Sequence, residues 1–441
     1  MLDDTLLDDP AALLRADRDR ALLALAGAGA RVRTALRLAG AAGVDELRPD
    51  GRPRAVLVAG HGSALTAGEV LAALAGTASL VTTLPPGDAE PVPRADRSAA
   101  PAAFTAGLAW QLPGWAGPLD LLVISSADGG ERGLIALAEQ AYARGCALVV
   151  TAPAGSPLAE AALQVRALPL PYVPANLPED GGPPAGPGTE PDLPAEDPAA
   201  LWAHLTPLLA LAQKLGVTQL RYDALDAAAD LLDATAVRCR PDAAAYTNPA
   251  KGLAARLAGT VPLLWAEGPV AGAAAVRFAA QLADRAGRPA LAGLLPQALV
   301  AHRGMFTGQL GAGADPDDFF RDRVEEPDPL HLQVLLLRHV PAASGANGAG
   351  GANGAGGANG TGGAAGRSDD GGEDAGPAEV PADDEGPRSF GASRAHRLAA
   401  AHDVRLTEYA SARSEPLHAL TDLVALTDFA AVYLGLAAAQ S

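Results

Sequence analysis

The chain has 441 residues, which is enough for two domains of ordinary size with full cores. Its formal net charge of −18 argues against nucleic-acid and anionic-membrane partners, because both bind basic surfaces. The two cysteines, Cys146 and Cys239, form no CxxC motif and no Cys/His cluster, so no metal site is expected. The first ten residues do not read as a signal peptide, and no run of 18 apolar residues occurs. We therefore expect a soluble, cytoplasmic protein.

The first part of the chain alternates helical and strand-like runs. Leucines near helical spacing predict a helix over residues 11–47. A strand over 54–58 then runs into the loop Gly60-His61-Gly62-Ser63, and a helix continues to residue 75. The elements expected next are a strand at 78–83, a short helix at 101–108, strands at 119–124 and 147–151, and helices at 133–144 and from 157. Strands alternating with helices predict a parallel sheet.

Two loops stand at the carboxyl ends of these strands, where parallel sheets bind ligands. In the first loop, Gly60, Gly62 and Ser63 offer backbone N–H groups, a hydroxyl and a helix N-terminus to an anion. The second loop, 125–130, begins with Ser125 and Ser126. The alternative is that the glycines only pack strand against helix and that Ser125 caps the following helix.

The second part of the chain repeats this plan after a linker at 174–199 that is rich in Pro, Gly and acidic residues. The elements expected are helices at 201–215, 271–284, 389–401 and 417–439, and strands at 261–265, 331–337 and 404–409. Between them, 342–387 contains Gly-Ala-Asn-Gly repeats and an acidic tract, and this composition predicts a disordered insert.

These landmarks resemble the tandem sugar-isomerase (SIS) domain proteins, above all the bifunctional phosphoglucose/phosphomannose isomerase family. The segments that carry the resemblance are 60–74, 121–150, 248–257, 261–289 and 428–434. The resemblance implies an α/β fold of two tandem SIS-type three-layer α/β/α domains with parallel sheets. The divisions expected are an N-terminal helical segment at 1–47, a first SIS domain at 48–173, the linker at 174–199, a second SIS domain at 200–341, the insert at 342–387, and the completion of the second domain at 388–441.

The same resemblance implies chemistry. The family interconverts aldose and ketose phosphates with a general base, a ring-opening group and a phosphate clamp, and needs no metal or redox cofactor. It also implies a homodimer. The residues placed in the sugar-phosphate site are Gly60, Gly62, Ser63, Ser125, Ser126 and Arg277. Arg277 either binds phosphate or pairs with an acid.

Several positions depart from the family pattern. In the second loop, Ala127, Gly130 and Gly133 stand where the family has hydroxyl residues, and Asp128 adds a negative charge. The catalytic base falls on Asp284, one methylene shorter than the family's glutamate. The ring-opening histidine falls on Val300, so that His302 is the candidate in its place.

Asp284 and His302 can also be interpreted as residues without a catalytic role. The first would be a solvated helix residue facing Arg285 or Arg288, and the second a loop histidine beside Arg303. The expected function is binding of a sugar phosphate with reduced or no isomerase activity. The alternatives are an active aldose–ketose isomerase and a non-catalytic scaffold or regulator.

Overall fold

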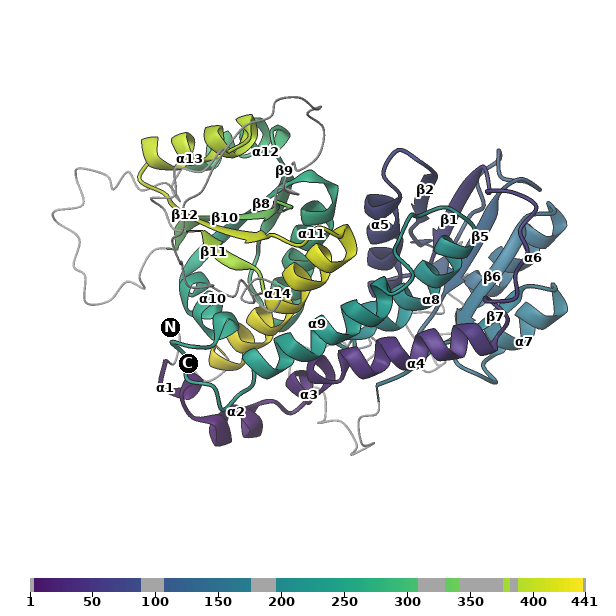
Figure 1. The fold of residues 1–441 in the computed structure, drawn as a ribbon, viewed down its shortest axis with the longest axis horizontal. Coiled ribbons are helices and arrows are strands. Elements are labelled where there is room, and N and C mark those ends of the chain that lie inside the picture. Colours follow the sequence, from purple (N-terminus) through teal and green to yellow (C-terminus); the bar gives the residue numbers. More distant parts are fainter. Residues whose placement is uncertain are drawn as a thin grey trace, which may run out of the picture.

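The fold is that of a computed structural model of the chain (Figure 1). It describes residues 4–88, 107–175, 196–307, 330–341, 376–380 and 388–438. Outside these residues lie most of the helix expected at 101–108, most of the linker, and all of the insert except 376–380.

The first sheet has five strands, all parallel to their neighbours, and this confirms the prediction of a parallel sheet. In spatial order they are β2 (Leu80–Leu84), β1 (Ala55–Ala59), β5 (Leu121–Ser125), β6 (Ala147–Ala152) and β7 (Leu168–Pro171). Val56 of β1 pairs with Val81 on one side and with Leu121 on the other. Two short strands, β3 (Gly87–Asp88) and β4 (Leu108–Ala109), form a separate antiparallel pair.

The second sheet repeats the order of the first four of these strands, β2 to β6, and has an antiparallel edge strand where the first sheet has the parallel strand β7. Its strands are β11 (Ala378–Val380), β12 (Arg405–Ser411), β10 (His331–His339), β8 (Thr260–Glu267) and β9 (Leu291–Leu294). The expectation of disorder throughout 342–387 is wrong for β11, because its backbone pairs with β12. We call the β1–β7 sheet with its helices the first half, and the β8–β12 sheet with its helices the second half.

The N-terminal segment forms several short helices and not the single helix predicted for 11–47. They are α1 (Asp4–Leu7), α2 (Pro10–Ala16), α3 (Ala21–Ala26) and α4 (Ala28–Ala41). Arg20 adopts a left-handed conformation before α3, and the Asp17 carboxylate accepts hydrogen bonds from the backbone N–H groups of Ala21 and Leu22. These bonds satisfy the free donors at the start of α3, so a new helix begins there.

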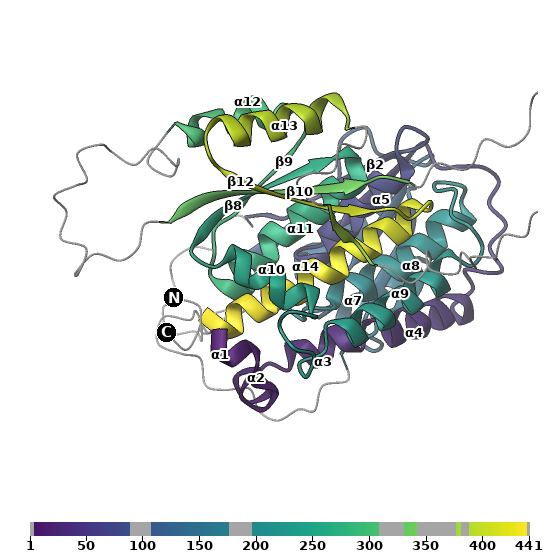
Figure 2. The same cartoon turned by 60° about the vertical axis from the view of Figure 1, so that its left-hand side comes forward.

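The remaining helices lie on both faces of each sheet, except α9, which packs against α4 and α14. In the first half they are α5 (Ser63–Ala75), α6 (Arg132–Ala143), α7 (Pro157–Gln164) and α8 (Ala200–Lys214). In the second half they are α9 (Ala224–Arg238), α10 (Pro249–Leu257), α11 (Gly268–Ala286), α12 (Gln297–Ala301), the 3₁₀ turn η2 (Arg303–Phe306), α13 (Phe390–Ala401) and α14 (Pro416–Ala438). Figure 2 shows α12 and α13 on one side of the second sheet, and α10, α11 and α14 on the other.

Alternate residues of each strand face different cores. In β1, Val56 belongs to a large core between the two sheets, whereas Leu57 belongs to a cluster shared with α6 and α7. In β8, Leu264 belongs to the large core, whereas Trp265 belongs to a smaller cluster shared with α12 and α13. The large core therefore joins one face of each sheet and fixes the two halves against each other.

Among the described residues, α14 is long and apolar enough to cross a membrane by length and composition. Its most apolar 18-residue window is 94% buried in the fold. It packs most extensively against α11, α10 and α9. Burial on this scale is typical of a core helix.

Candidate functional site

The first loop lies where β1 and β5 end side by side. A Cβ on Gly60 would lie 2.6 Å from the backbone oxygen of Ser125, so only glycine allows the two loops to approach this closely. Gly62 has a φ of +55°, which side-chain-bearing residues rarely adopt, and this turn aims the start of α5 at the sheet edge. The Trp110 indole N–H donates to the Gly60 carbonyl oxygen at 3.2 Å and anchors the loop.

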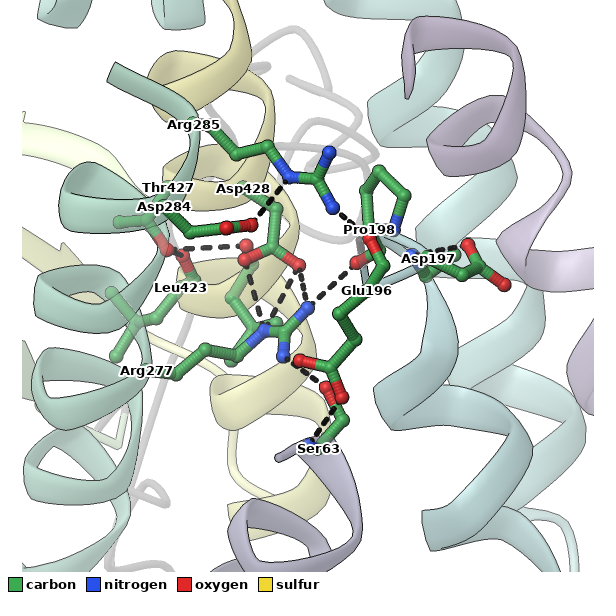
Figure 3. A network of polar contacts seen from close by, with 12 residues as sticks. Ser63, Glu196, Asp197, Pro198, Arg277, Asp284, Arg285, Leu423, Thr427 and Asp428 are labelled. Carbon is green, nitrogen blue, oxygen red and sulfur yellow. Dashed lines mark hydrogen bonds and ion pairs between the residues drawn. The ribbon is translucent and has the colours of Figure 1, made fainter. Parts of the chain in front are cut away.

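The start of α5 already carries a carboxylate. The backbone N–H of Ser63 donates to Oε1 of Glu196 at 2.5 Å (Figure 3). The Ser63 hydroxyl accepts a longer hydrogen bond, 3.4 Å, from Nη1 of Arg277. The backbone N–H and the hydroxyl of Ser63 are thus both hydrogen-bonded to charged side chains at a helix N-terminus.

Ser125 and Ser126 of the second loop are buried and bonded within the protein. The Ser125 hydroxyl contacts Nδ1 of His204 at 2.7 Å. The Ser126 hydroxyl donates to the Glu131 carboxylate at 2.7 Å and accepts from the backbone N–H groups of Asp128 and Gly129. The hydrogen bond from the Gly129 N–H to the Ser126 hydroxyl closes the turn over residues 126–129.

His204 is neutral in this setting. Complete burial lowers its pKa to about 3, and the nearby His61 adds to this. The ring stacks at a tilt on Tyr172, with centroids 4.8 Å apart. A neutral imidazole can accept the Ser125 hydroxyl hydrogen, so the contact holds Ser125 in place without a charge.

A histidine–glutamate pair completes the edge of the first sheet. Nε2 of His61 lies 2.9 Å from Oε1 of Glu131. The hydrogen bond to Glu131 raises the pKa of His61. Burial alone would raise the pKa of Glu131, but the hydrogen bonds from His61 and Ser126 outweigh it and lower that pKa. The pair is a partly exposed imidazole, whose protonated form Glu131 favours, beside a buried carboxylate.

Arg277 on α11 joins the two halves. Its guanidinium makes a bidentate pair with Asp428 of α14, with Nε–Oδ1 at 2.9 Å and Nη2–Oδ2 at 2.8 Å. The same Nη2 donates to the Pro198 carbonyl oxygen at 2.7 Å. Burial raises the pKa of Asp428, and Arg277 opposes this rise. Of the two roles expected for Arg277, pairing with an acid is therefore the one that the structure contains.

Asp284 and His302 lie in different layers. Asp284 follows Arg277 on α11, and its half-exposed carboxylate pairs with Arg285 at 2.9 Å. Arg285 in turn donates a hydrogen bond to the Glu196 carbonyl oxygen, and Glu196 contacts Ser63. Asp284 is therefore part of the same network of contacts between the two halves as Ser63 (Figure 3). His302 lies across the second sheet, where its Nδ1 accepts a hydrogen bond of 3.0 Å from the Trp265 indole, and burial lowers its pKa.

Five further residues take part in the contacts described above, and sequence reasoning gave none of them a role: His61, Glu131, Glu196, His204 and Asp428. His61 and Glu131 carried a signal, because both belong to loops at the carboxyl ends of predicted strands. Glu196 stood in a segment whose composition indicated only a linker. In the part of the chain that the structure describes, His, Cys, Asp and Glu side chains form no group of three that could hold a metal ion.

Comparison with known families finds a match for part of the second half. Residues 246–337 match the sequence model of the bacterial phospho-glucose isomerase C-terminal SIS domain. The match begins just before α10 and ends in β10, and it includes Arg277, Asp284 and His302. No curated protein matches the chain.

Three solved structures are examples of proteins whose backbone follows a similar path. A hypothetical protein from Thermus thermophilus is 16% identical over 97% of this chain and 89% of its own, with a TM-score of 0.49. The C-terminal domain of glucosamine-fructose-6-phosphate aminotransferase from Francisella tularensis is 9% identical over 94% and 96%, with a TM-score of 0.47. A glucose-6-phosphate isomerase like protein from Thermus thermophilus is 18% identical over 74% and 83%, with a TM-score of 0.35.

The family match covers part of the second half, from α10 into β10, and the first half repeats the order of the four parallel strands of the second sheet. The chain therefore has an α/β fold of two sheets with a related strand order, and its residues 246–337 are similar to the C-terminal SIS domain of bacterial phospho-glucose isomerase.

Proposed function

We propose that this chain binds a sugar phosphate at the edge of the first sheet and has reduced or no aldose–ketose isomerase activity. The observation that carries the proposal is the seat at the start of α5. There a carboxylate oxygen accepts the Ser63 N–H, and a buried guanidinium from Arg277 lies beside the Ser63 hydroxyl. Helix N-termini with such donors favour phosphate groups. The match to a phosphoglucose isomerase SIS domain supports a sugar phosphate as the ligand class.

The state of the candidate catalytic groups supports weak turnover. Proton transfer between adjacent carbons needs a free carboxylate within hydrogen-bond reach of the substrate. Asp284 is paired with Arg285, and His302 is held by Trp265 on the far face of the second sheet. A displacement of about 1 Å in a catalytic group already costs about 100-fold in rate.

A second candidate, the active isomerase, is favoured by one observation. His61 is a partly exposed histidine with a raised pKa in the ligand loop, so it could protonate a sugar ring oxygen near neutral pH. In that case Asp284 would still have to leave Arg285 to serve as the base.

The experiment measures binding and turnover on the same preparation. We expect millimolar glucose 6-phosphate, mannose 6-phosphate or fructose 6-phosphate to raise the melting temperature. We expect interconversion of these sugars to be near background. Turnover that disappears in Asp284→Ala would establish the active isomerase. If none of the three sugar phosphates raises the melting temperature, the remaining interpretation is a non-catalytic scaffold or regulator.

The proposal includes a homodimer in the cytoplasm that works without nucleic acid, membrane, metal or redox cofactor. The dimer is part of the resemblance to the isomerase family. Size-exclusion chromatography with light scattering would measure it directly.

A further inference from the structure

The segment 196–198 lies between the two halves, directly before α8 (Figure 3). Glu196 reaches the first loop with its side chain and the second half with its backbone. Its carboxylate accepts the Ser63 N–H, and its carbonyl oxygen accepts a hydrogen bond from Arg285. The segment therefore occupies the seat where the proposed function places a phosphate group.

The carboxylate fills this seat closely. An ideal Cβ built on Gly62 would lie 2.5 Å from Oε1 of Glu196 and 3.1 Å from its Cδ. A backbone N–H at a helix N-terminus favours a carboxylate oxygen as its acceptor, and the Glu196 carboxylate takes this place at Ser63. A phosphate oxygen and this carboxylate oxygen cannot occupy the Ser63 N–H at the same time.

Three arginines from two helices, α11 and α4, hold the segment in position. Arg285 holds the Glu196 carbonyl oxygen, and Arg277 holds the Pro198 carbonyl oxygen at 2.7 Å. Between them, Asp197 pairs with Arg31 of α4 at 2.5 Å, and its other carboxylate oxygen accepts from the Ala199 N–H at 3.0 Å. The backbone of the segment is fixed independently of the Glu196 carboxylate, so the carboxylate can be altered without removing the segment.

We infer that Glu196 is an autoinhibitory pseudo-ligand, whose carboxylate must leave the start of α5 before a phosphate group can bind. The inference rests on the proposed function, because it concerns the same seat. A ligand that competes with a tethered occupant binds with its intrinsic affinity multiplied by the fraction of molecules in which the seat is open. The occupant therefore sets the ligand concentration at which the site fills.

The test compares three variants with the wild-type chain by titration calorimetry. Glu196→Gln removes the charge and keeps the length of the side chain. Glu196→Ala also removes the acceptor. Glu160→Gln is the matched control, because Glu160 is an exposed glutamate on α7. The probes are inorganic phosphate and glucose 6-phosphate, titrated separately, and circular dichroism checks that each variant is folded.

We expect both Glu196 variants to bind each probe at least about tenfold more tightly than the wild type, since a charge-assisted hydrogen bond no longer competes. Glu160→Gln should bind as the wild type does. The inference is overturned if the Glu196 variants bind phosphate no more tightly than the wild type, including the case in which none of the proteins binds it.

The same titrations test the proposed function separately from the role of Glu196. If the variants bind phosphate more tightly but do not bind glucose 6-phosphate, mannose 6-phosphate or fructose 6-phosphate, Glu196 is a pseudo-ligand and the proposed binding of a sugar phosphate is wrong. Equal binding of a sugar phosphate by wild type and variants keeps the proposed function and removes the pseudo-ligand.

Discussion

The two halves share a strand order but differ at the equivalent turn from strand to helix. In the first half, Gly60, His61 and Gly62 separate β1 from α5 and leave backbone N–H groups facing the sheet edge. In the second half, β8 ends at Glu267 and α11 begins at the next residue. Pro269 then occupies the first turn and has no N–H to donate. Of the two turns, the first is the one to which the proposed function assigns the phosphate group.

Charges at the second edge satisfy one another. Arg338 at the end of β10 pairs with Glu267 at 2.5 Å and with Glu408 at 2.6 Å. His396 contacts the other oxygen of Glu408 at 2.9 Å. The comparison teaches that two sheets with a related strand order differ at this edge: the first has a glycine-containing loop, and the second has a cluster of paired charges. The function is decided by the loops and not by the strand order.

The largest expected effect tests the contact through which the second half reaches the ligand loop of the first. Arg277→Met removes a guanidinium that is only 2% exposed and leaves Asp428 buried without its partner. Breaking a buried pair in this way costs about 3–5 kcal/mol. We expect urea denaturation to show a loss of that size in the free energy of unfolding.

The control is Arg221→Met, which removes an exposed pair with Asp223. Exposed pairs of this kind contribute little, so no clear loss is expected. If Arg277→Met destabilises no more than this control, Arg277 does not join the halves as described. The double variant Arg277→Met with Asp428→Leu should recover part of the loss, because no unpaired charge remains buried.

A second prediction compares the glycines at the two turns. Gly62 and Gly268 both have positive φ values, +55° and +82°. An alanine at either position costs about 1–3 kcal/mol through backbone strain. Only at Gly62 would the new Cβ enter the anion seat, because a Cβ on Gly268 would meet nothing within 4 Å.

We therefore expect both Gly62→Ala and Gly268→Ala to lower the melting temperature. Only Gly62→Ala should weaken glucose 6-phosphate binding, by about tenfold or more, because of the lost seat. Calorimetry on the folded variants measures this. Equal weakening by Gly268→Ala would show that the two turns are functionally alike and would break the comparison.

Much of the fold could be predicted because its buried strands are continuous apolar runs. The runs at 119–124 and 147–151 predicted β5 and β6 within two residues. The edge strand β7 was missed, because Leu168–Pro171 alternates leucine with proline, which is depleted in strands. The N-terminal helix was predicted without its breaks, which depend on the side chain of Asp17 and the left-handed Arg20.

The candidate site was harder to predict, because its contacts join distant parts of the chain. Ser63 and Arg277 are 214 residues apart, and Arg277 and Asp428 are 151 apart. Periodicity and local motifs identify the loop and the helix, but only the packing of the large core decides which residues meet. Glu196 shows this most clearly, since its acidic, proline-rich surroundings indicate a linker and not a contact with Ser63.

The smallest expected effect concerns the histidine–glutamate pair of each half. His61 with Glu131 and His396 with Glu408 have the same N–O distance of 2.9 Å, and each histidine side chain is 26% exposed. Glu131 raises the pKa of His61, so the folded state favours the protonated ring. The stabilisation is complete below the ordinary histidine pKa of about 6.5 and is lost as the pH rises through the raised pKa of the folded state.

His61→Gln should therefore destabilise the protein more at about pH 6 than at about pH 9. The difference is about 1 kcal/mol, since a hydrogen bond to a charged group contributes more than one between neutral groups. Urea denaturation across this range measures it. His396→Gln is the matched variant, and we expect a smaller loss because Glu408 keeps its ion pair with Arg338 at 2.6 Å, whereas Glu131 keeps hydrogen bonds from uncharged donors such as the Ser126 hydroxyl. Equal losses in the two variants would mean that the second cluster is no better satisfied than the first, and the difference between the halves would then lie in their glycines alone.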